Sequence, residues 1–351
     1  MRERRPSQTM KRHGRLWQRI TDIENLHEAY RRARKGKSWQ NTVKRFESHL
    51  DQNLLRIQQS LMTKSFRTSP YTEKIIHEPK TRTIYRLPFD PDRVVQHALM
   101  NVIEPIWSAL FIDDSYACII GKGIHAGSRR TMEFIRKNRF CLKMDISKFY
   151  PSVDHDILFD IVKRKIKCAD TLWLIRNIIY SFPGGKNVPI GNYTSQWFGN
   201  LYLNELDTFI KQQEGVRHYV RYCDDFCLFS NDKARLSDLA HKIRNFLASR
   251  LKLALSKCDL FPVSRGVDFL GYRHFPKYIL IRKSTVKRVK KWLAALPALY
   301  RSGEIPRERM MSSIASTVGW LRWANSYNLS RALGINDLMR LCRNGTTEAI
   351  Q

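Results

Sequence analysis

Two adjacent carboxylates stand inside an apolar run at residues 219–230, which read YVRYCDDFCLFS. Aromatic and aliphatic residues flank Asp224 and Asp225 on both sides. This pattern predicts two short buried strands joined by a tight turn, with the carboxylates at its tip. Because two like charges held together cost free energy, the pair requires a neutralising partner or solvent.

A third carboxylate, Asp145, ends the apolar strand pattern of CLKMDISKFY. Three carboxylates on neighbouring strands suit a hard divalent cation such as Mg²⁺, which usually takes one or two carboxylates together with substrate phosphates. Two such ions, roughly 3.5–4 Å apart, clamp an in-line phosphoryl displacement of the kind that polymerases perform. The alternative is a solvated turn, and we interpret FIDDSY, with Asp113 and Asp114, as a turn of that kind.

Helices and hairpins must position these carboxylates. Apolar spacing of three and four residues predicts helices within 22–63, from Pro91 with Asp90 as its cap, and at 128–138, 156–181, 195–213, 233–251 and 284–345. Two hairpins are expected, one in YTEKIIHEPKTRTIYRLPF and one formed by VDFLGYRHF and YILIRK. Asp154 is expected to cap the helix that follows it. The order of elements favours the α+β class.

Composition points to a folded protein with a polyanionic partner. The hydrophobic content is 43%, and the net charge is +30 with a pI of about 10.1. A surplus of this size makes nucleic acid the leading partner, with an anionic membrane surface as the competing interpretation. No stretch reaches the roughly 18–20 apolar residues of a spanning helix, and MRERRPSQTMKRHGRLWQRI lacks the apolar core of a signal peptide. We therefore expect a cytoplasmic protein without a membrane partner.

Two other patterns carry less chemistry. The seven cysteines have no C-x-x-C spacing, so most are expected to be small buried residues in a reducing compartment. The glycine-rich GKGIHAG at 121–127 lacks the order of a phosphate-binding P-loop. We interpret it as a turn, with a backbone contact to template or nucleotide as the alternative.

The carboxylate motifs resemble those of a known family. YCDD, Tyr222 to Asp225, resembles the Y-x-D-D signature of reverse transcriptases, and DISKFYPSVDH resembles the strand that carries their first metal-binding aspartate. Three more segments follow the family order over roughly residues 65 to 330: KTRTIYRLPFDPDRVVQHAL, IGNYTSQWFGNLYLNELD and FLGY. The resemblance implies a right-hand polymerase with a central antiparallel palm sheet and a helical thumb. Its expected parts are a basic N-terminal helical extension at 1–64, fingers and palm at 65–275, and a basic helical thumb at 276–351.

The resemblance also implies roles for individual residues. Asp145, Asp224 and Asp225 would be catalytic and, together with Ile146, would form the set that binds two Mg²⁺ ions, with Mn²⁺ as a substitute. The expected nucleotide-binding residues are Arg82, Tyr150, Ile190 and Gln196; Lys257 is a candidate general acid; and Lys80, Arg86, Lys287 and Arg288 are expected to bind nucleic acid. Tyr150 would exclude ribonucleotides at the sugar 2′ position, and a core tyrosine is its alternative. Each of the cations could instead be a solvated surface charge.

Residues 190–196, IGNYTSQ, indicate a subtype. Most reverse transcriptases carry Q-G-x-x-x-S-P there, whereas I-G-x-x-x-S-Q is typical of diversity-generating retroelement enzymes. The segment GWLRWANSYNL, near the end of this chain, also resembles the thumb of those enzymes. That subtype copies a template RNA into cDNA with frequent errors opposite adenine, and it works with a small basic pentameric accessory protein. A glutamine at position 190 could form a hydrogen bond near the incoming nucleotide and so penalise a badly placed one, whereas Ile190 cannot. The alternative is that the Ile190 side chain only packs against its neighbours.

Two alternatives stay open. One is a reverse transcriptase of another lineage, either an antiphage-defence enzyme or a group II intron relative; the I-G-x-x-x-S-Q pattern disfavours the intron form. The other is a non-catalytic RNA-binding scaffold, against which the three retained, mutually repelling aspartates argue.

Overall fold

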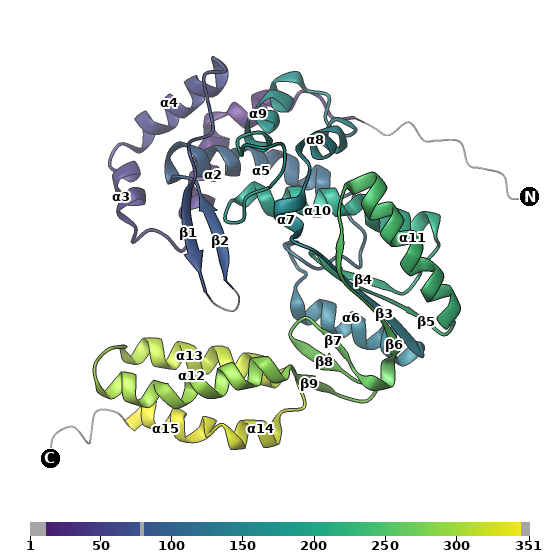
Figure 1. The fold of residues 1–351 in the computed structure, drawn as a ribbon. Coiled ribbons are helices and arrows are strands. Elements are labelled where there is room, and N and C mark those ends of the chain that lie inside the picture. Colours follow the sequence, from purple (N-terminus) through teal and green to yellow (C-terminus); the bar gives the residue numbers. More distant parts are fainter. Residues whose placement is uncertain (1–11, 78–80, 345–351) are drawn as a thin grey trace, which may run out of the picture.

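The computed structural model describes residues 12–77 and 81–344 of the 351-residue chain (Figure 1). The N-terminal part contains α1 (Trp17–Thr21), α2 (Ile23–Arg34), α3 (Asn41–Glu47), α4 (Leu50–Met62), β1 (Thr72–Ile76), β2 (Arg82–Arg86) and α5 (Val94–Ser108). The centre contains α6 (Ile124–Lys137), β3 (Phe140–Ile146), α7 (Phe149–Ser152), α8 (His155–Lys163), α9 (Ala169–Ile179), α10 (Tyr193–Thr208), β4 (Tyr219–Tyr222), β5 (Asp225–Ser230) and α11 (Lys233–Leu251). The C-terminal part contains β6 (Leu255–Pro262), β7 (Val267–Phe269), β8 (Tyr272–His274), β9 (Ile279–Ile281), α12 (Lys283–Arg301), α13 (Arg307–Arg322), α14 (Tyr327–Ala332) and α15 (Ile335–Asn344).

The central sheet has four antiparallel strands in the order β4-β5-β3-β6. Because side chains alternate along each strand, Met144 and Phe226 face the main core, to which α11 also contributes. Cys141 and Cys227 face a second core, which is completed by Phe134 of α6 and by the small sheet β7-β8-β9. The expected α+β right-hand architecture, with its antiparallel palm sheet and helical thumb, is confirmed.

The N-terminal helices belong to the same core as the fingers and palm. Buried residues of α2 and α4, such as Leu26 and Leu54, lie in one cluster with Leu99 of α5 and Leu203 of α10. The β1–β2 hairpin projects from this body toward the thumb helices (Figure 1). The division of the chain at residues 64/65 and 275/276 stays a prediction.

The thumb, α12–α15, has its own small core and docks on the palm through aromatic rings. Trp320 stacks on Tyr272 with ring centroids 5.0 Å apart, and Trp323 stacks on His125 at 4.6 Å. The Trp323 indole N–H also donates to Ser128 Oγ at 2.8 Å. The position of the thumb therefore depends on α6 and the small sheet.

Two expected helices differ from the structure. The expected helix at 156–181 is divided into α8 and α9, because the backbone of His13 pairs with Lys165 and Lys167 in the segment between them. A π-helical turn, Phe89–Arg93, precedes α5, and the Asp90 carboxylate forms an ion pair with Arg56 at 2.6 Å instead of capping a helix.

The expected cap by Asp154 is confirmed, since its carboxylate accepts from the backbone N–H groups that begin α8. No helix in the described ranges is both long and apolar enough to cross a membrane.

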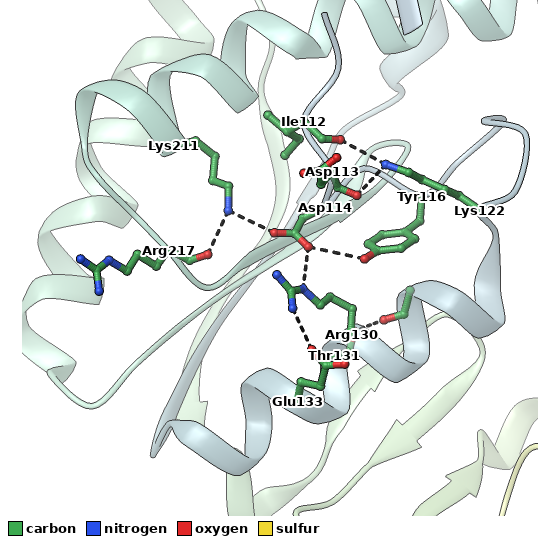
Figure 2. Close-up of polar contacts among 11 residues, drawn as sticks. Ile112, Asp113, Asp114, Tyr116, Lys122, Arg130, Thr131, Glu133, Lys211 and Arg217 are labelled. Atoms are coloured by element: carbon green, nitrogen blue, oxygen red, sulfur yellow. Dashed lines mark hydrogen bonds and ion pairs between the residues drawn. The ribbon is translucent and has the colours of Figure 1, made fainter. Parts of the chain in front are cut away.

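The interpretation of the Asp113–Asp114 pair as a solvated turn was wrong for Asp114. Asp114 is buried, and Figure 2 shows its carboxylate between Arg130 of α6, at 2.8 Å, and Lys211, at 3.1 Å. The carbonyl of Asp114 and the N–H of Tyr116 pair with the backbone of Arg221, in β4, so the buried carboxylate belongs to an extra edge segment of the palm sheet. Asp113, in contrast, is exposed.

Replacing Asp114 with Ala should lower the free energy of unfolding by about 1–3 kcal/mol, because Lys211 loses its carboxylate partner and Arg130 loses one of two. Urea denaturation measures this change. Asp113→Ala is the matched control and should stay within about 0.5 kcal/mol of the wild type. Equal effects of the two substitutions would contradict the assignment.

Candidate active site

A tight turn between β4 and β5 carries the carboxylate pair. Tyr222 and Asp225 are the last paired residues of the two strands, so Cys223 and Asp224 form a two-residue loop. Cys223 has a positive φ of 57°, as the first loop residue of a type II′ hairpin turn requires. The predicted strand-turn-strand is confirmed, with Asp224 in the turn and Asp225 at the start of β5.

Strand β3 brings the third aspartate to this turn. Asp145 lies directly opposite Asp225 in the β3–β5 register, so both side chains leave the same face of the sheet. The backbone N–H of Ile146 donates to the carbonyl of Asp224 at 3.2 Å and fixes the turn against the end of β3. The structure therefore brings Asp145, Ile146, Asp224 and Asp225 together at one end of the palm sheet.

Asp225 is held by a buried lysine. Lys143 Nζ donates to Asp225 Oδ2 at 2.9 Å and also to the carbonyl of Asp268. The other carboxylate oxygen, Asp225 Oδ1, is buried and has no hydrogen-bond partner in the described part of the chain. Burial raises the pKa of Asp225 to about 6, against the opposing effect of Lys143.

The donor set suits a hard cation only in part. Carboxylates are the ligands that Mg²⁺ prefers, and Asp225 Oδ1 is a buried acceptor without a donor. Across residues 12–77 and 81–344, however, no three Asp, Glu, His or Cys side chains are grouped closely enough to hold an ion by themselves. An ion at this position would need further oxygen ligands, such as substrate phosphates.

A fully buried ion pair contacts the turn that carries Asp224. The guanidinium of Arg221, in β4, binds both oxygens of Asp207, in α10, at 2.8 and 2.5 Å. Arg221 also donates to the carbonyl of Cys223 at 3.2 Å and to Asn200 Oδ1 at 3.3 Å. Tyr219 completes the set by donating to Asp207 at 2.7 Å. The network joins α10 to the loop that carries Asp224.

Tyr150 lies beside the same turn. The Cys223 thiol donates to Tyr150 Oη at 3.6 Å, and burial raises the pKa of Tyr150, so its hydroxyl stays neutral. Gly199 of α10 lets the ring approach, because a Cβ there would lie 3.1 Å from ring carbons of both Phe149 and Tyr150. Tyr150 therefore contributes a neutral hydroxyl and a closely packed ring beside the turn, and no charge.

Ile190 lies in the loop before α10 and contacts the fingers hairpin through its backbone. Its carbonyl accepts from the N–H of Tyr85, in β2, at 3.0 Å. Gly191 has a φ of +119°, and a Cβ there would lie 2.6 Å from Ile84, so the close approach requires glycine. Gln196 is exposed on the first turn of α10.

The expected cations lie at several places. Arg82 and Arg86 are exposed at the two ends of β2, and Lys287 and Arg288 are exposed on α12. Lys257, in β6, lies directly opposite Asp145 and forms an ion pair with Asp259 at 3.2 Å. Lys80 lies outside the described residues.

Sequence reasoning missed the residues that hold the site from behind, namely Lys143, Asn200, Asp207 and Arg221. Each is a polar or charged residue that the structure buries. Lys143 and Arg221 stand out in the sequence, since each interrupts an apolar strand pattern and a buried charge requires a partner. The identity of the partners was not visible, because it depends on how α10 packs against the sheet.

The part of the chain that carries the carboxylate site matches a known family. The sequence model described as "Reverse transcriptase (RNA-dependent DNA polymerase)" matches residues 76–274. Protein YkfC of Escherichia coli is 26% identical over 264 residues, which cover 61% of this chain and 68% of YkfC.

Two further relatives differ in their length. The retron Ec73 reverse transcriptase of Escherichia coli is 29% identical, and the match covers 59% of this chain and 71% of that protein. The group II intron-encoded protein LtrA of Lactococcus lactis is 23% identical, with 69% of this chain and 52% of LtrA covered. This chain therefore spans about half of LtrA.

Arg221→Met should lower the free energy of unfolding by about 3–5 kcal/mol, because it leaves the Asp207 carboxylate buried without its partner. Asp207→Leu should cost a similar amount. The double substitution should recover much of the loss, which urea denaturation of all four proteins in a double-mutant cycle would measure. Additive losses would contradict a direct pair.

The raised pKa of Asp225 predicts a pH-dependent stability. Its favourable contribution is complete below the usual pKa of 3.8 and is lost as the pH rises through about 6. The free energy of unfolding of Asp225→Asn, measured relative to wild type, should therefore rise by up to about 3 kcal/mol between pH 4 and pH 7, in addition to any difference that is independent of pH. Denaturation in EDTA measures the difference, and Asp113→Asn is the control. A difference that does not change with pH would refute the raised pKa.

Proposed function

The chain belongs to the reverse transcriptase family, and from that premise we propose that it copies a template RNA into cDNA within a diversity-generating retroelement, with errors at template adenines. One observation carries the polymerase assignment: the register of the palm sheet sets Asp145 opposite Asp225, with Asp224 in the adjoining turn. The I-G-x-x-x-S-Q pattern at 190–196 supports the subtype.

The reaction is nucleotidyl transfer. The primer 3′-hydroxyl oxygen forms a bond to the α-phosphorus of a dNTP, the bond from that phosphorus to the bridging oxygen breaks, and pyrophosphate leaves. We assign the holding of two Mg²⁺ ions, or Mn²⁺ in their place, to Asp145, Asp224, Asp225 and the backbone of Ile146, together with substrate phosphates. When bound, such ions favour ionisation of the hydroxyl and stabilise charge on the phosphate oxygens.

The surrounding side chains would position the substrates. We assign to Tyr150, whose ring lies against the turn, the exclusion of a ribose 2′-hydroxyl. Arg82, exposed on β2, would bind the triphosphate, and Lys257, opposite Asp145, would donate a proton to pyrophosphate. Arg86, Lys287 and Arg288 are exposed cations suited to the nucleic-acid backbone, and Lys80 and Gln196 remain proposed contacts.

The relatives favour a second candidate. The retron and group II intron proteins named above make a reverse transcriptase of another lineage the main competitor. A non-catalytic RNA-binding scaffold is the third. The subtype also implies a small basic pentameric accessory protein, and adding that protein to the assays below tests whether synthesis requires it.

Asp224→Asn should reduce Mg²⁺-dependent cDNA synthesis from a defined RNA template by about 10³-fold or more, because several kcal/mol of transition-state stabilisation are lost. Single-nucleotide incorporation measures the rate. Asp113→Asn, at the exposed aspartate of the other pair, is the control and should keep the wild-type rate. Unchanged synthesis in Asp224→Asn would refute the assigned role, and no synthesis from the wild type with its accessory protein would favour the scaffold.

Ile190→Gln should lower misincorporation opposite template adenine by about 10-fold or more, because an amide near the incoming nucleotide adds about 1–3 kcal/mol of discrimination. Sequencing of the cDNA gives the error spectrum. Ile190→Leu keeps the apolar bulk and should keep the errors. An unchanged spectrum in Ile190→Gln would contradict this origin of the errors, and accurate synthesis by the wild type would favour a retron or intron relative.

A further inference from the structure

A pocket lined by aromatic and basic side chains lies away from the carboxylates, on the fingers. It has a volume of about 390 Å³ and is formed by α9 and by the segment before β1, with Arg67, Trp173, Arg176 and Tyr180 among its lining residues. The geometry points to a binding site for single-stranded RNA. Its ligand would be a part of the template RNA that lies outside the segment held at the carboxylates. This inference rests on the proposed function for its choice of RNA as the ligand.

The floor of the pocket is held rigidly by hydrogen bonds. The Asn177 side chain accepts from the backbone N–H and the hydroxyl of Thr68, both at 3.0 Å, and donates to the carbonyl of Phe66 at 3.0 Å. The Tyr180 hydroxyl donates to Asp156 at 2.6 Å. These polar groups are already engaged within the protein, so a ligand would meet the aromatic rings and the guanidinium groups.

Both arginines are available for an anion. Arg67 and Arg176 are exposed, and within the described ranges neither forms an ion pair with a carboxylate. Arg176 lies over the ring of Tyr180 at 5.3 Å, while Arg67 donates to the backbone carbonyl of Phe66 at 2.8 Å. No Asp or Glu lines the pocket among the described residues. The charged residues that line the pocket are therefore both cations, and the Asp156 carboxylate lies at its edge, on the Tyr180 hydroxyl.

Rings beside guanidinium groups match the chemistry of single-stranded nucleic acid. Bases stack on aromatic side chains whatever their sequence, and arginines bind the phosphates between them. Trp173 is half-buried and is held edge-on by Trp17 at 5.9 Å, which orients its ring in advance. The pocket volume falls in the range of small-ligand sites, which is large enough for a nucleotide.

The pocket is connected to the fingers hairpin. Tyr71 forms a hydrogen bond with Ser181 of the pocket at 2.7 Å, and its ring packs on Tyr85 of β2 at 6.3 Å. Phe182, next to Ser181, packs on Tyr85 at 4.9 Å. RNA held in the pocket would thus be close to the element that carries Arg82.

The test compares two fluorescent probes in binding titrations. One is a blunt RNA–DNA hybrid, and the other is the same hybrid with a template flank of about ten unpaired nucleotides that carries 4-thiouridine for cross-linking. The variant is Arg67→Ala/Arg176→Ala. The matched control, Arg217→Ala/Arg235→Ala, removes two exposed arginines from a pocket at the start of α11.

We expect Arg67→Ala/Arg176→Ala to bind the flanked probe about tenfold more weakly, with a shallower salt dependence, and to bind the blunt probe like the wild type. The control should not distinguish the probes, and the wild-type cross-link should map to α9. Equal weakening on both probes, a control with the same effect, or a cross-link elsewhere would overturn the site. Flank-specific binding that depends on Arg67 and Arg176 would stand even if the wild type made no cDNA, so the two proposals fail separately.

Discussion

The buried ion pair between Arg221 and Asp207 is the contact on which the geometry of the site depends. It joins a palm strand to α10, and the same guanidinium holds the carbonyl of Cys223 in the turn. A buried pair gives little net stability compared with an apolar substitute, but it is strongly directional. Here that direction is transmitted to Asp224, one residue further along. The position of a half-buried carboxylate thus depends on an interaction in the core.

Charge at the aspartates is compensated in part. Lys143 compensates Asp225 from within the second core, whereas Lys257, opposite Asp145 on the neighbouring strand, forms its ion pair with Asp259. Neither cation satisfies Asp225 Oδ1. The protein therefore neutralises enough of the charge to fold while it leaves acceptor capacity at the sheet end.

Much of the fold followed from local patterns. Apolar residues on both sides of the aspartate pair predicted the hairpin at Asp224, and periodic apolar residues predicted α11 and the helical thumb. The sequence could not predict that Asp114 is buried, because its partners Arg130 and Lys211 come from distant elements. For the same reason the break between α8 and α9 depends on a backbone contact with His13. Local propensity specifies helices and strands, whereas tertiary packing decides whether a charged side chain is buried or exposed.

The hydrogen bond between Ile190 and Tyr85 joins two main-chain atoms. The fingers hairpin is therefore held at this point whatever side chain occupies position 190. If the side chain at position 190 influences the choice of nucleotide as proposed above, a lineage could exchange it without losing this hydrogen bond. Accuracy would then be a trait that can drift or be selected on its own, separated from the integrity of the enzyme.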